Sequence, residues 1–413
     1  MAKKRVVITG VGVIASNGIG KEAFSSALFK GVSGIKPISL FDSAPFKVKS
    51  AGEISDFSAE EFLGAKGLRT LDRSTKLAAS GAKLALDDAG LAITEENSRL
   101  TGVVMGTTLG SLRSICDFDR EAMLEGPHYV NPALFPNTVI NSPASQVSIK
   151  LNIKGFNATI STGFCAGIDA VGYALDFLRL GRVRTVLAGA VEELCLQTFL
   201  GFYKTGCLAG LEAGKLEISC PFDKRRNGVI FGEGSSVLVL EDLEYALSRK
   251  ARIYCELCAF GSSFDAYAIN EYNAQGEGLR RAMRMAIEEA GLSPAQVDYI
   301  CAAANSGIQA DKIESWAIRG VFGDCADKVY TSSVKSMLGE CYSASGSLQL
   351  AAGVCAIEQQ MIPPTINYQE KDPECNLNYV TEGPLSTKVD NVLINAFGPS
   401  GCNSSLLISR FRG

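Results

Sequence analysis

The chain has 413 residues, of which 46% are hydrophobic and 20% are charged, so its composition is that of a folded globular protein and excludes extended disorder. The net charge is −4 and the basic blocks are short, which argues against a nucleic-acid surface and a membrane-binding polybasic tract. No apolar run reaches membrane-spanning length, and the N-terminus passes into a strand pattern without the apolar region of a signal peptide.

The 13 cysteines are odd in number and irregularly spaced, and several lie within apolar runs. This pattern is typical of reduced, buried thiols and predicts a cytoplasmic protein. Cys255 and Cys258 form one CxxC motif inside the strand-like stretch Arg252–Phe260, but no second pair follows at zinc spacing. We therefore interpret both as packed thiols and predict no metal site.

A first strand is predicted over Arg5–Gly10. It leads into Gly10-Val-Gly-Val-Ile-Ala15, which nominally matches the glycine motif of dinucleotide-binding folds. Such a site needs a helix that opens directly on the glycine turn. Here Ser16–Gly20 prolong the loop and the helix begins near Lys21, so the motif gives little support to a dinucleotide site.

Further elements alternate between helices and apolar strands. The pattern predicts a helix over Leu71–Ala89, a short buried strand over Thr101–Met105, a loop-rich stretch over Gly126–Ala144 and a buried strand over Thr185–Gly189. Alternation of this kind is typical of an α/β protein with a parallel or mixed sheet covered by helices on both faces.

The chain also repeats itself weakly. In each half a buried strand is followed by a second strand that ends the half: Thr185–Val191 and Gly234–Leu240, then Asn391–Phe397 and Cys402–Ile408. A duplicated α/β unit joined near Arg252 explains this arrangement. We therefore expect two halves, residues 1–252 and 253–413, packed as one body.

The stretch Asn157–Asp169 predicts a sharp corner between a strand and a helix. A β-prone run meets Gly163 and Gly167, which allow backbone conformations that other residues resist, and a helical pattern follows. A side chain at the apex would stand at a helix N-terminus, which is how a nucleophile elbow presents its nucleophile. The residue at the apex, however, is Phe164.

Several stretches, in this order and spacing, identify the chain as similar to a known family: Arg5–Ile14, Leu71–Arg73, Phe135–Thr138, Cys220–Gly228, Gly232–Ser235, Val334–Gly339, Ile362–Asn367 and Asn395–Gly398. Across nearly its whole length the chain resembles the β-ketoacyl-acyl-carrier-protein synthases of the thiolase fold. The resemblance implies a thiolase-like duplicated αβαβα fold with mixed five-stranded sheets. It also implies a substrate carried on the phosphopantetheine of an acyl carrier protein, with no other cofactor.

That family uses a cysteine at the corner and two histidines for decarboxylative condensation. The matching positions in this chain are Phe164, Ala303 and Glu340. The only histidine of the chain is His128, in a loop where a surface role is expected. Phenylalanine has no nucleophilic chemistry, and we expect the ring of Phe164 to fill the volume where an acyl thioester would form.

Two neighbouring residues offer alternatives. Cys165 is one residue past the apex and would serve as nucleophile if the corner were shifted, but a step of one residue turns a helical side chain by about 100 degrees. A buried, packed thiol is the plainer interpretation. Glu340 could act as a base if burial raised its pKa. We expect it instead to be salt-bridged, with Lys335 or a partner-chain group as candidates.

Other positions retain the family pattern. Asp311 and Glu314, with Lys335, match its polar support near the site, and Phe397 matches its gating aromatic, although Pro399 stiffens the loop that follows. The resemblance also places Leu112, Ile115 and Cys116 in a segment at the dimer interface, bordering the partner's acyl tunnel: we expect these three and Phe397 to bind substrate.

A synthase fold without its cysteine and histidines resembles the chain-length factor of type II polyketide systems, which make aromatic polyketides or polyenes. The resemblance implies a heterodimer with a catalytic ketosynthase subunit and contact with an acyl carrier protein. Two alternatives stay open. One is a divergent condensing enzyme that uses Cys165 with Glu340 as base, and the other is a non-catalytic scaffold that binds an acyl carrier protein.

Overall fold

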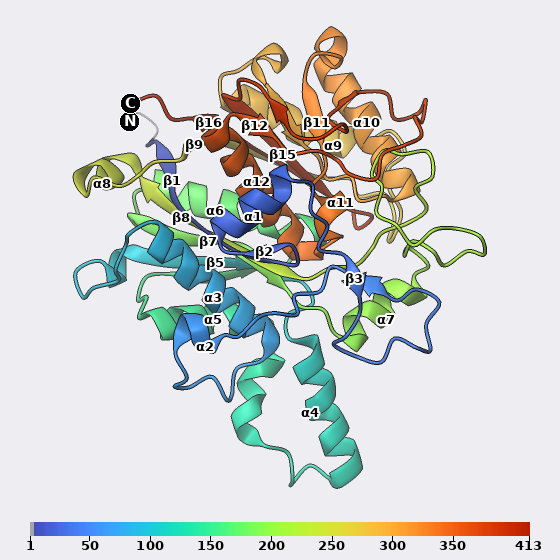
Figure 1. Ribbon diagram of the computed structural model, residues 1–413. Helices are drawn as coiled ribbons and strands as arrows, with labels where there is room; N and C mark the ends of the chain where they lie inside the picture. The colour runs from blue at the N-terminus through green and yellow to red at the C-terminus, as the bar shows by residue number, and fades with distance from the viewer. Residues whose placement is uncertain (1–3) are drawn as a thin grey trace.

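Two sets of five strands lie edge to edge in one 12-stranded mixed sheet of the computed structural model, which describes residues 4–413 (Figure 1). The N-terminal set is, in spatial order, β6 (Asn157–Ile160), β5 (Thr101–Gly106), β7 (Thr185–Glu192), β8 (Gly234–Asp242) and β1 (Val6–Ala15). The C-terminal set is β11 (Tyr330–Ser332), β10 (Tyr299–Cys301), β15 (Asn391–Phe397), β16 (Cys402–Arg410) and β9 (Cys255–Phe264). The short strands β13 (Asn378–Tyr379) and β2 (Gly18–Ile19) pair with β11 and β1.

Both sets repeat one pairing pattern. Strands β6, β5 and β7 are parallel neighbours, and β8 and β1 continue antiparallel; β11, β10, β15, β16 and β9 follow the same scheme. Antiparallel pairing of β1 with β9, from Val6 with Leu257 to Ile8 with Cys255, joins the two sets. The predicted duplicated fold with five-stranded sheets is therefore confirmed. The boundary predicted at 252–253 lies between α8 (Leu243–Ser248) and β9.

Helices form three layers around these strands. The outer layers are α3 (Arg73–Asp88) with α5 (Ser142–Leu151) and α9 (Glu277–Glu289) with α10 (Ile308–Phe322). Between them, α6 (Ala166–Arg179) and α12 (Ser345–Gln359) contact each other and strands of both sets. The layers thus alternate in the expected αβαβα order, and the largest apolar core surrounds the two central helices.

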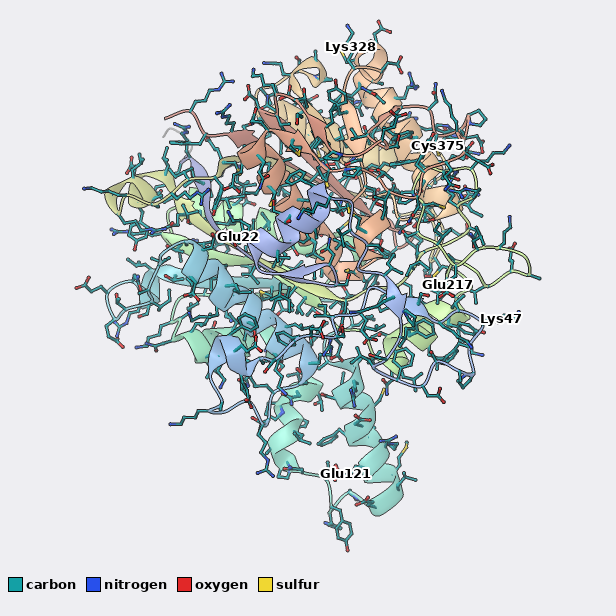
Figure 2. The ribbon with its side chains drawn as sticks, viewed as in Figure 1. Glu22, Lys47, Glu121, Glu217, Lys328 and Cys375 are labelled. Atoms are coloured by element: carbon teal, nitrogen blue, oxygen red, sulfur yellow. The ribbon has the colours of Figure 1, made fainter. Side chains whose placement is uncertain are left out.

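The other elements are short or lie outside the layers: α1 (Lys21–Phe29), α2 (Glu60–Leu63), α4 (Leu112–Glu125), α7 (Leu196–Lys204), α11 (Lys335–Leu338), the 3₁₀ helices η1 (Ser98–Leu100), η2 (Pro132–Thr138), η3 (Gly163–Cys165), η4 (Pro294–Gln296), η5 (Gly323–Cys325) and η6 (Tyr342–Ala344), and the strand pairs β3 (Lys36–Pro37) with β4 (Ser50–Ala51) and β12 (Met361–Ile362) with β14 (Leu385–Ser386). Helix α4 and the following η2 project from the body of the molecule (Figure 1). We call residues 112–138 the α4 arm. Glu121 labels its outer part in Figure 2.

Strand β1 runs from Val6 to Ala15 and is therefore longer than the strand predicted over Arg5–Gly10. The glycine motif therefore lies within a strand and not in a turn before a helix, which removes the dinucleotide interpretation. Its glycines serve packing: a Cβ atom added to Gly12 would lie 2.0 Å from the Gly81 carbonyl oxygen of α3. The helix predicted over Leu71–Ala89 is present as α3, and Asp72 caps it by accepting a hydrogen bond from the Thr75 amide.

Candidate functional site

The predicted corner over Asn157–Asp169 is present. Strand β6 ends at Ile160, the turn η3 carries Phe164 at its apex, and α6 begins at Ala166. Gly163 adopts a φ of 66°, and its amide donates to Thr108 Oγ1 at 3.0 Å. Gly163 thus takes a left-handed conformation that a residue with a side chain rarely adopts, which explains a glycine at this point of the corner.

Phe164 stands at the apex with its ring held between two neighbours. It packs edge-on against Tyr342, with ring centroids 4.7 Å apart. On the other side a Cβ atom added to Gly398 would lie 2.2 Å from Phe164 Cδ2, so the ring lies directly against the backbone at 398. The side chain at the corner is therefore fixed by packing on both sides.

A cavity of about 640 Å³ lies beside Phe164. Its apolar wall includes Leu109, Leu112 and Phe202 in addition to Phe164, and its polar wall includes Asn305. The ring of Phe164 thus forms one wall of an open space, and the filling of the volume where an acyl thioester would form stays a prediction. A volume of this size is typical of small-molecule sites, which range from about 300 to 1,000 Å³.

Cys165 lies behind the corner and away from the cavity. The side chain is fully buried, and its thiol donates a hydrogen bond to the Ala396 carbonyl oxygen at 3.2 Å. Burial, followed by the charge of Asp169, raises the pKa of the Cys165 thiol well above its ordinary value. A buried thiol that stays protonated is a poor nucleophile. The cavity wall contains the thiol of Cys207. This thiol accepts a hydrogen bond from the Thr205 hydroxyl and donates one to the Phe202 carbonyl oxygen.

Glu340 is buried and fully engaged in hydrogen bonds. Its Oε2 accepts from Lys335 Nζ and Asn305 Nδ2, each at 2.8 Å. Its Oε1 accepts from Ser345 Oγ at 2.6 Å and from the Tyr342 amide at 2.9 Å. The salt bridge to Lys335 expected from the sequence is therefore present. Both carboxylate oxygens are therefore occupied by donors from this chain, and neither is free to contact a substrate.

Ala303 contributes only its backbone to this network. Its carbonyl oxygen accepts from Lys335 Nζ at 2.8 Å, and its amide donates to Glu314 Oε1 at 2.9 Å. Asp311 accepts from the amide of Asn305 at 2.9 Å. Burial raises the pKa of Glu314 to about 7 and that of Asp311 to about 6. These carboxyl groups hold the backbone at 303–305 in place, which is the polar support predicted for them.

The structure separates the four predicted substrate-binding residues. Leu112, the first residue of α4, lines the cavity. Ile115 and Cys116 lie farther along α4, are half-buried, and do not line it. Phe397 is buried, and its ring packs edge-on against Tyr272, with centroids 5.6 Å apart, while Tyr272 itself lines the cavity. Of the four predicted substrate-binding residues, Leu112 is the one that lines the cavity, where it meets Phe164.

The α4 arm exposes apolar side chains. Met123 and Leu124 are 85% and 78% exposed, and Phe135 is 58% exposed. Large exposed apolar side chains that lie together are typical of protein interfaces. His128 lies in the same arm and is exposed, as predicted. The arm therefore combines exposed apolar side chains with a residue at its base, Leu112, that lines the cavity.

Tyr342 is a cavity residue that sequence reasoning missed. Its ring packs edge-on against Phe164 and, at 5.4 Å between centroids, against Phe202. Burial, then the nearby charges of Glu192 and Glu340, raise the pKa of its phenol to about 12. The sequence contained one indication of its place: Tyr342 follows by two residues Glu340, the position at which the family has a histidine.

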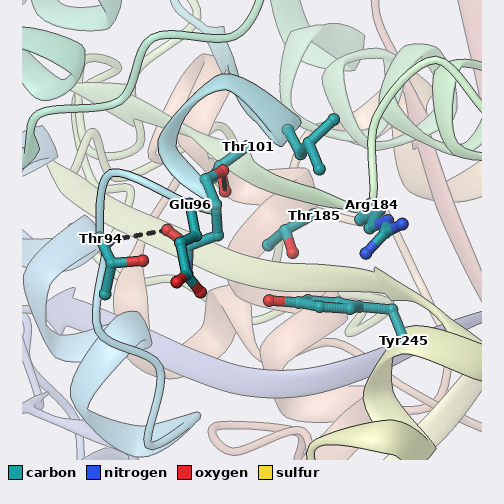
Figure 3. Close-up of a pocket in the computed structure, with 8 residues that line it drawn as sticks. Thr94, Glu96, Thr101, Arg184, Thr185 and Tyr245 are labelled. Atoms are coloured by element: carbon teal, nitrogen blue, oxygen red, sulfur yellow. Dashed lines mark hydrogen bonds between the residues drawn. The ribbon is translucent and has the colours of Figure 1, made fainter.

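Two further cavities lie elsewhere. One of about 150 Å³ is walled by Thr94, Arg184 and Tyr245, with the Thr94 amide hydrogen-bonded to Asn97 Oδ1 at 2.8 Å (Figure 3). Another of about 490 Å³ lies near the base of the α4 arm and is lined in part by Glu193. Residues 4–413 contain no group of three metal-ligating side chains, and the helices among them lack the length and apolar character of a membrane span.

Comparisons with known proteins agree with this fold. The N-terminal domain of β-ketoacyl synthase matches residues 3–246, and its C-terminal domain matches residues 254–369. The chain is 36% identical over 412 residues to 3-oxoacyl-(acyl-carrier-protein) synthase 2 of Coxiella burnetii, with 99% of each chain covered. It is 35% identical over 413 residues to the protein of the same name from Synechocystis sp., covering 100% of this chain and 99% of that one.

Solved structures of ketosynthases are also similar to this chain. The ishigamide ketosynthase/chain length factor superposes with a TM-score of 0.91 and 34% identity over 100% of both chains. A type II polyketide synthase acyl-carrier protein in complex with its ketosynthase bound to the hexaketide gives a TM-score of 0.91 and 30% identity, over 99% of this chain and 100% of that one. The chain therefore belongs to the β-ketoacyl synthase family.

Proposed function

We propose that this chain is the chain-length-factor subunit of a type II polyketide ketosynthase, and that a partner subunit carries out the condensation. The observation that carries the proposal is the corner, where Phe164 stands at the apex and Glu340 is tied to Lys335. Neither side chain supplies the nucleophile or the neutral hydrogen-bond donors that decarboxylative condensation needs. With one histidine in the chain, a site of two histidines cannot be assembled from it.

The partner would be a catalytic ketosynthase that forms a heterodimer with this chain in the cytoplasm. The apolar surface of the α4 arm supports such an interface. The acyl group would travel on the phosphopantetheine of an acyl carrier protein, as the similarity to a ketosynthase solved with its acyl-carrier protein suggests. This subunit would bound the tunnel that sets product length through Ile115 and Cys116 of α4.

A second candidate function draws on the curated relatives, whose name is that of a condensing enzyme. In that case the chain would be a divergent synthase that uses Cys165. The burial of Cys165 and its hydrogen bond to the Ala396 carbonyl oxygen weigh against it. The third possibility is a scaffold that binds an acyl carrier protein without influence on product length. It differs from the proposal in that α4 does not bound the tunnel.

Co-expression with a cysteine- and histidine-bearing ketosynthase from the same organism tests the proposal. We expect the two chains to co-purify in equal amounts, and condensation to require the partner. The isolated chain, treated with an acyl thioester, should gain no acyl group and form no product. An acyl group on Cys165 together with product formation by the chain alone would overturn the proposal in favour of the enzyme.

Product length separates the proposal from the scaffold. Ile115→Ala removes side-chain volume from α4 outside the cavity of this chain. Leu112→Ala removes side-chain volume from the cavity wall. If α4 borders the partner's tunnel, Ile115→Ala in the heterodimer lengthens the product. Unchanged length in both variants would favour the scaffold.

A further inference from the structure

The small cavity of Figure 3 lies at the edge of the sheet opposite the corner. Strands β5 and β7 are parallel neighbours, and their first residues, Thr101 and Thr185, are register partners that both line this cavity. The corner follows the other end of a parallel strand, because it comes after the last residue of β6. The cavity is therefore separate from the site beside Phe164.

The walls of this cavity are fixed by hydrogen bonds of the backbone. The Arg184 amide donates to the Leu100 carbonyl oxygen at 2.9 Å. In the loop before β5, the Asn97 carboxamide donates to the Ala92 carbonyl oxygen at 2.9 Å and accepts from the Thr94 amide at 2.8 Å. A ligand would thus meet walls that need little ordering, which reduces the entropic cost of binding.

Two opposite charges line this cavity without pairing. Arg184 and Glu96 are both exposed, and in Figure 3 they stand on opposite sides with Thr185 between them. Within residues 4–413 neither side chain forms an ion pair. The Arg184 guanidinium lies over the Tyr245 ring, 5.7 Å from the ring centroid, and this cation–π contact favours its position at the cavity.

The volume and the charges of the cavity indicate a class of ligand. Its volume of about 150 Å³ corresponds to about five water molecules at about 30 Å³ each, so the occupant must be small. A carboxylate matches the paired N–H donors of the Arg184 guanidinium, and an ammonium group matches the Glu96 carboxylate. Thr185 is only 1% exposed and lines the cavity, so its hydroxyl can donate to the same ligand carboxylate.

We propose that this cavity binds a small free α-amino acid of the size of glycine or alanine, whose carboxylate contacts Arg184 and whose ammonium group contacts Glu96. The inference is independent of the proposed function, because the cavity shares no lining residue with the one beside Phe164. The bound amino acid links the loop before β5 to the start of β7. Because both charged side chains are exposed, binding is weak and decreases as the ionic strength rises.

The test uses the purified full-length chain and three probes. Glycine carries both charges, acetate lacks the ammonium group, and glycinamide lacks the carboxylate. At about pH 6 the carboxylates are ionised and the amino groups are protonated. Titrations followed by saturation-transfer NMR should show glycine binding about two- to fivefold more tightly than either analogue, the effect of one exposed ion pair.

Two substitutions then assign the two charges. Arg184→Gln should abolish the preference for glycine over glycinamide and keep the preference over acetate, and Glu96→Gln should do the reverse. Arg182→Gln and Glu95→Gln are the matched controls, because these neighbouring side chains are exposed and lie outside the cavity wall. Both preferences should persist in the controls.

Three results would overturn the proposal. The first is the absence of glycine binding, and the second is equal binding of glycine and the two analogues by the unchanged chain. The third is a preference for glycine that survives both Arg184→Gln and Glu96→Gln, because the ligand charges would then contact other groups. The comparison of the three probes needs no substitution, so it stays informative even if a variant folds poorly.

Discussion

Lys335 Nζ lies 2.8 Å from Glu340 Oε2, and both side chains are buried beside the cavity. Removing one partner leaves the other charge in a nonpolar environment without compensation. We expect Glu340→Ala to lower the free energy of unfolding by about 3–5 kcal/mol, the usual effect of breaking a buried pair. Urea denaturation followed by circular dichroism measures the change.

The double variant Lys335→Met, Glu340→Leu is the control for this pair, because it removes both charges and restores packed volume. Such replacements are often neutral, so most of the lost stability should return. A loss of less than about 1 kcal/mol in Glu340→Ala, as for an exposed pair, would show that Lys335 finds another partner.

Glu193 makes stability depend on pH. Its carboxyl is buried and accepts hydrogen bonds from the amides of Ser74 at 3.2 Å and Arg113 at 3.4 Å. Burial, then the charge of Asp72, raises its pKa from 4.5 to about 8. The folded state therefore holds a proton that the unfolded state releases above the ordinary pKa. This contribution is fully present below pH 4.5 and is lost as the pH rises through 8.

Glu193→Gln should accordingly flatten the decline of the thermal midpoint between about pH 5 and pH 8 and stabilise the protein at the alkaline end. Glu95→Gln is the matched control, since Glu95 is exposed, pairs with Lys154, and has a lowered pKa. Its profile should match that of the unchanged protein over the same range. Identical slopes for Glu193→Gln and the unchanged protein would contradict the assignment.

A cysteine placed at the apex should be reactive. In Phe164→Cys the thiol would face the cavity near the N-terminus of α6, where the helix dipole lowers a thiol pKa. We expect iodoacetamide to alkylate position 164 before any native cysteine, as peptide mass mapping would show. Adding Cys165→Ala should leave this labelling unchanged. Preferential labelling of Cys165 would place the accessible position one residue further on.

Gly398 should tolerate no side chain while Phe164 is present. A Cβ atom at 398 would lie 2.2 Å from Phe164 Cδ2, so the ring must move in Gly398→Ala. Overpacking of this kind costs about 1–3 kcal/mol, and Phe164→Leu in the same chain should recover part of it. Gly201→Ala is the control, because beyond the adjoining backbone of α7 no atom lies within 4 Å of its added Cβ. Equal stability of the two alanine variants would contradict this packing.

Sequence reasoning was correct for features whose local pattern of apolar residues and glycines agrees with the tertiary structure. The duplicated sheets, helix α3 and the corner at Asn157–Asp169 all follow from hydrophobic periodicity and glycine placement. The pairing of Glu340 with Lys335 could be predicted because a buried carboxylate five residues from a lysine needs a counter-charge.

The length of β1 could not be predicted, because its glycines looked like a turn. Only the approach of Gly81 of α3 shows that Gly12 makes room for a helix, and this contact spans about seventy positions of sequence. Likewise, the open cavity beside Phe164 and the contact of the Tyr342 ring with Phe164 depend on how several separate loops pack. No local pattern records such packing.

The position of β1 also governs how the chain folds as it is made. Strand β1 is synthesised first, yet its two long neighbours are β8, which ends at Asp242, and β9, which begins at Cys255. At about 5–20 residues per second, an apolar ten-residue strand waits roughly 12–50 s on the ribosome for its neighbours. During that interval it can pair with other chains. The yield of folded protein should therefore depend on chaperones that hold the first strand until the second half emerges.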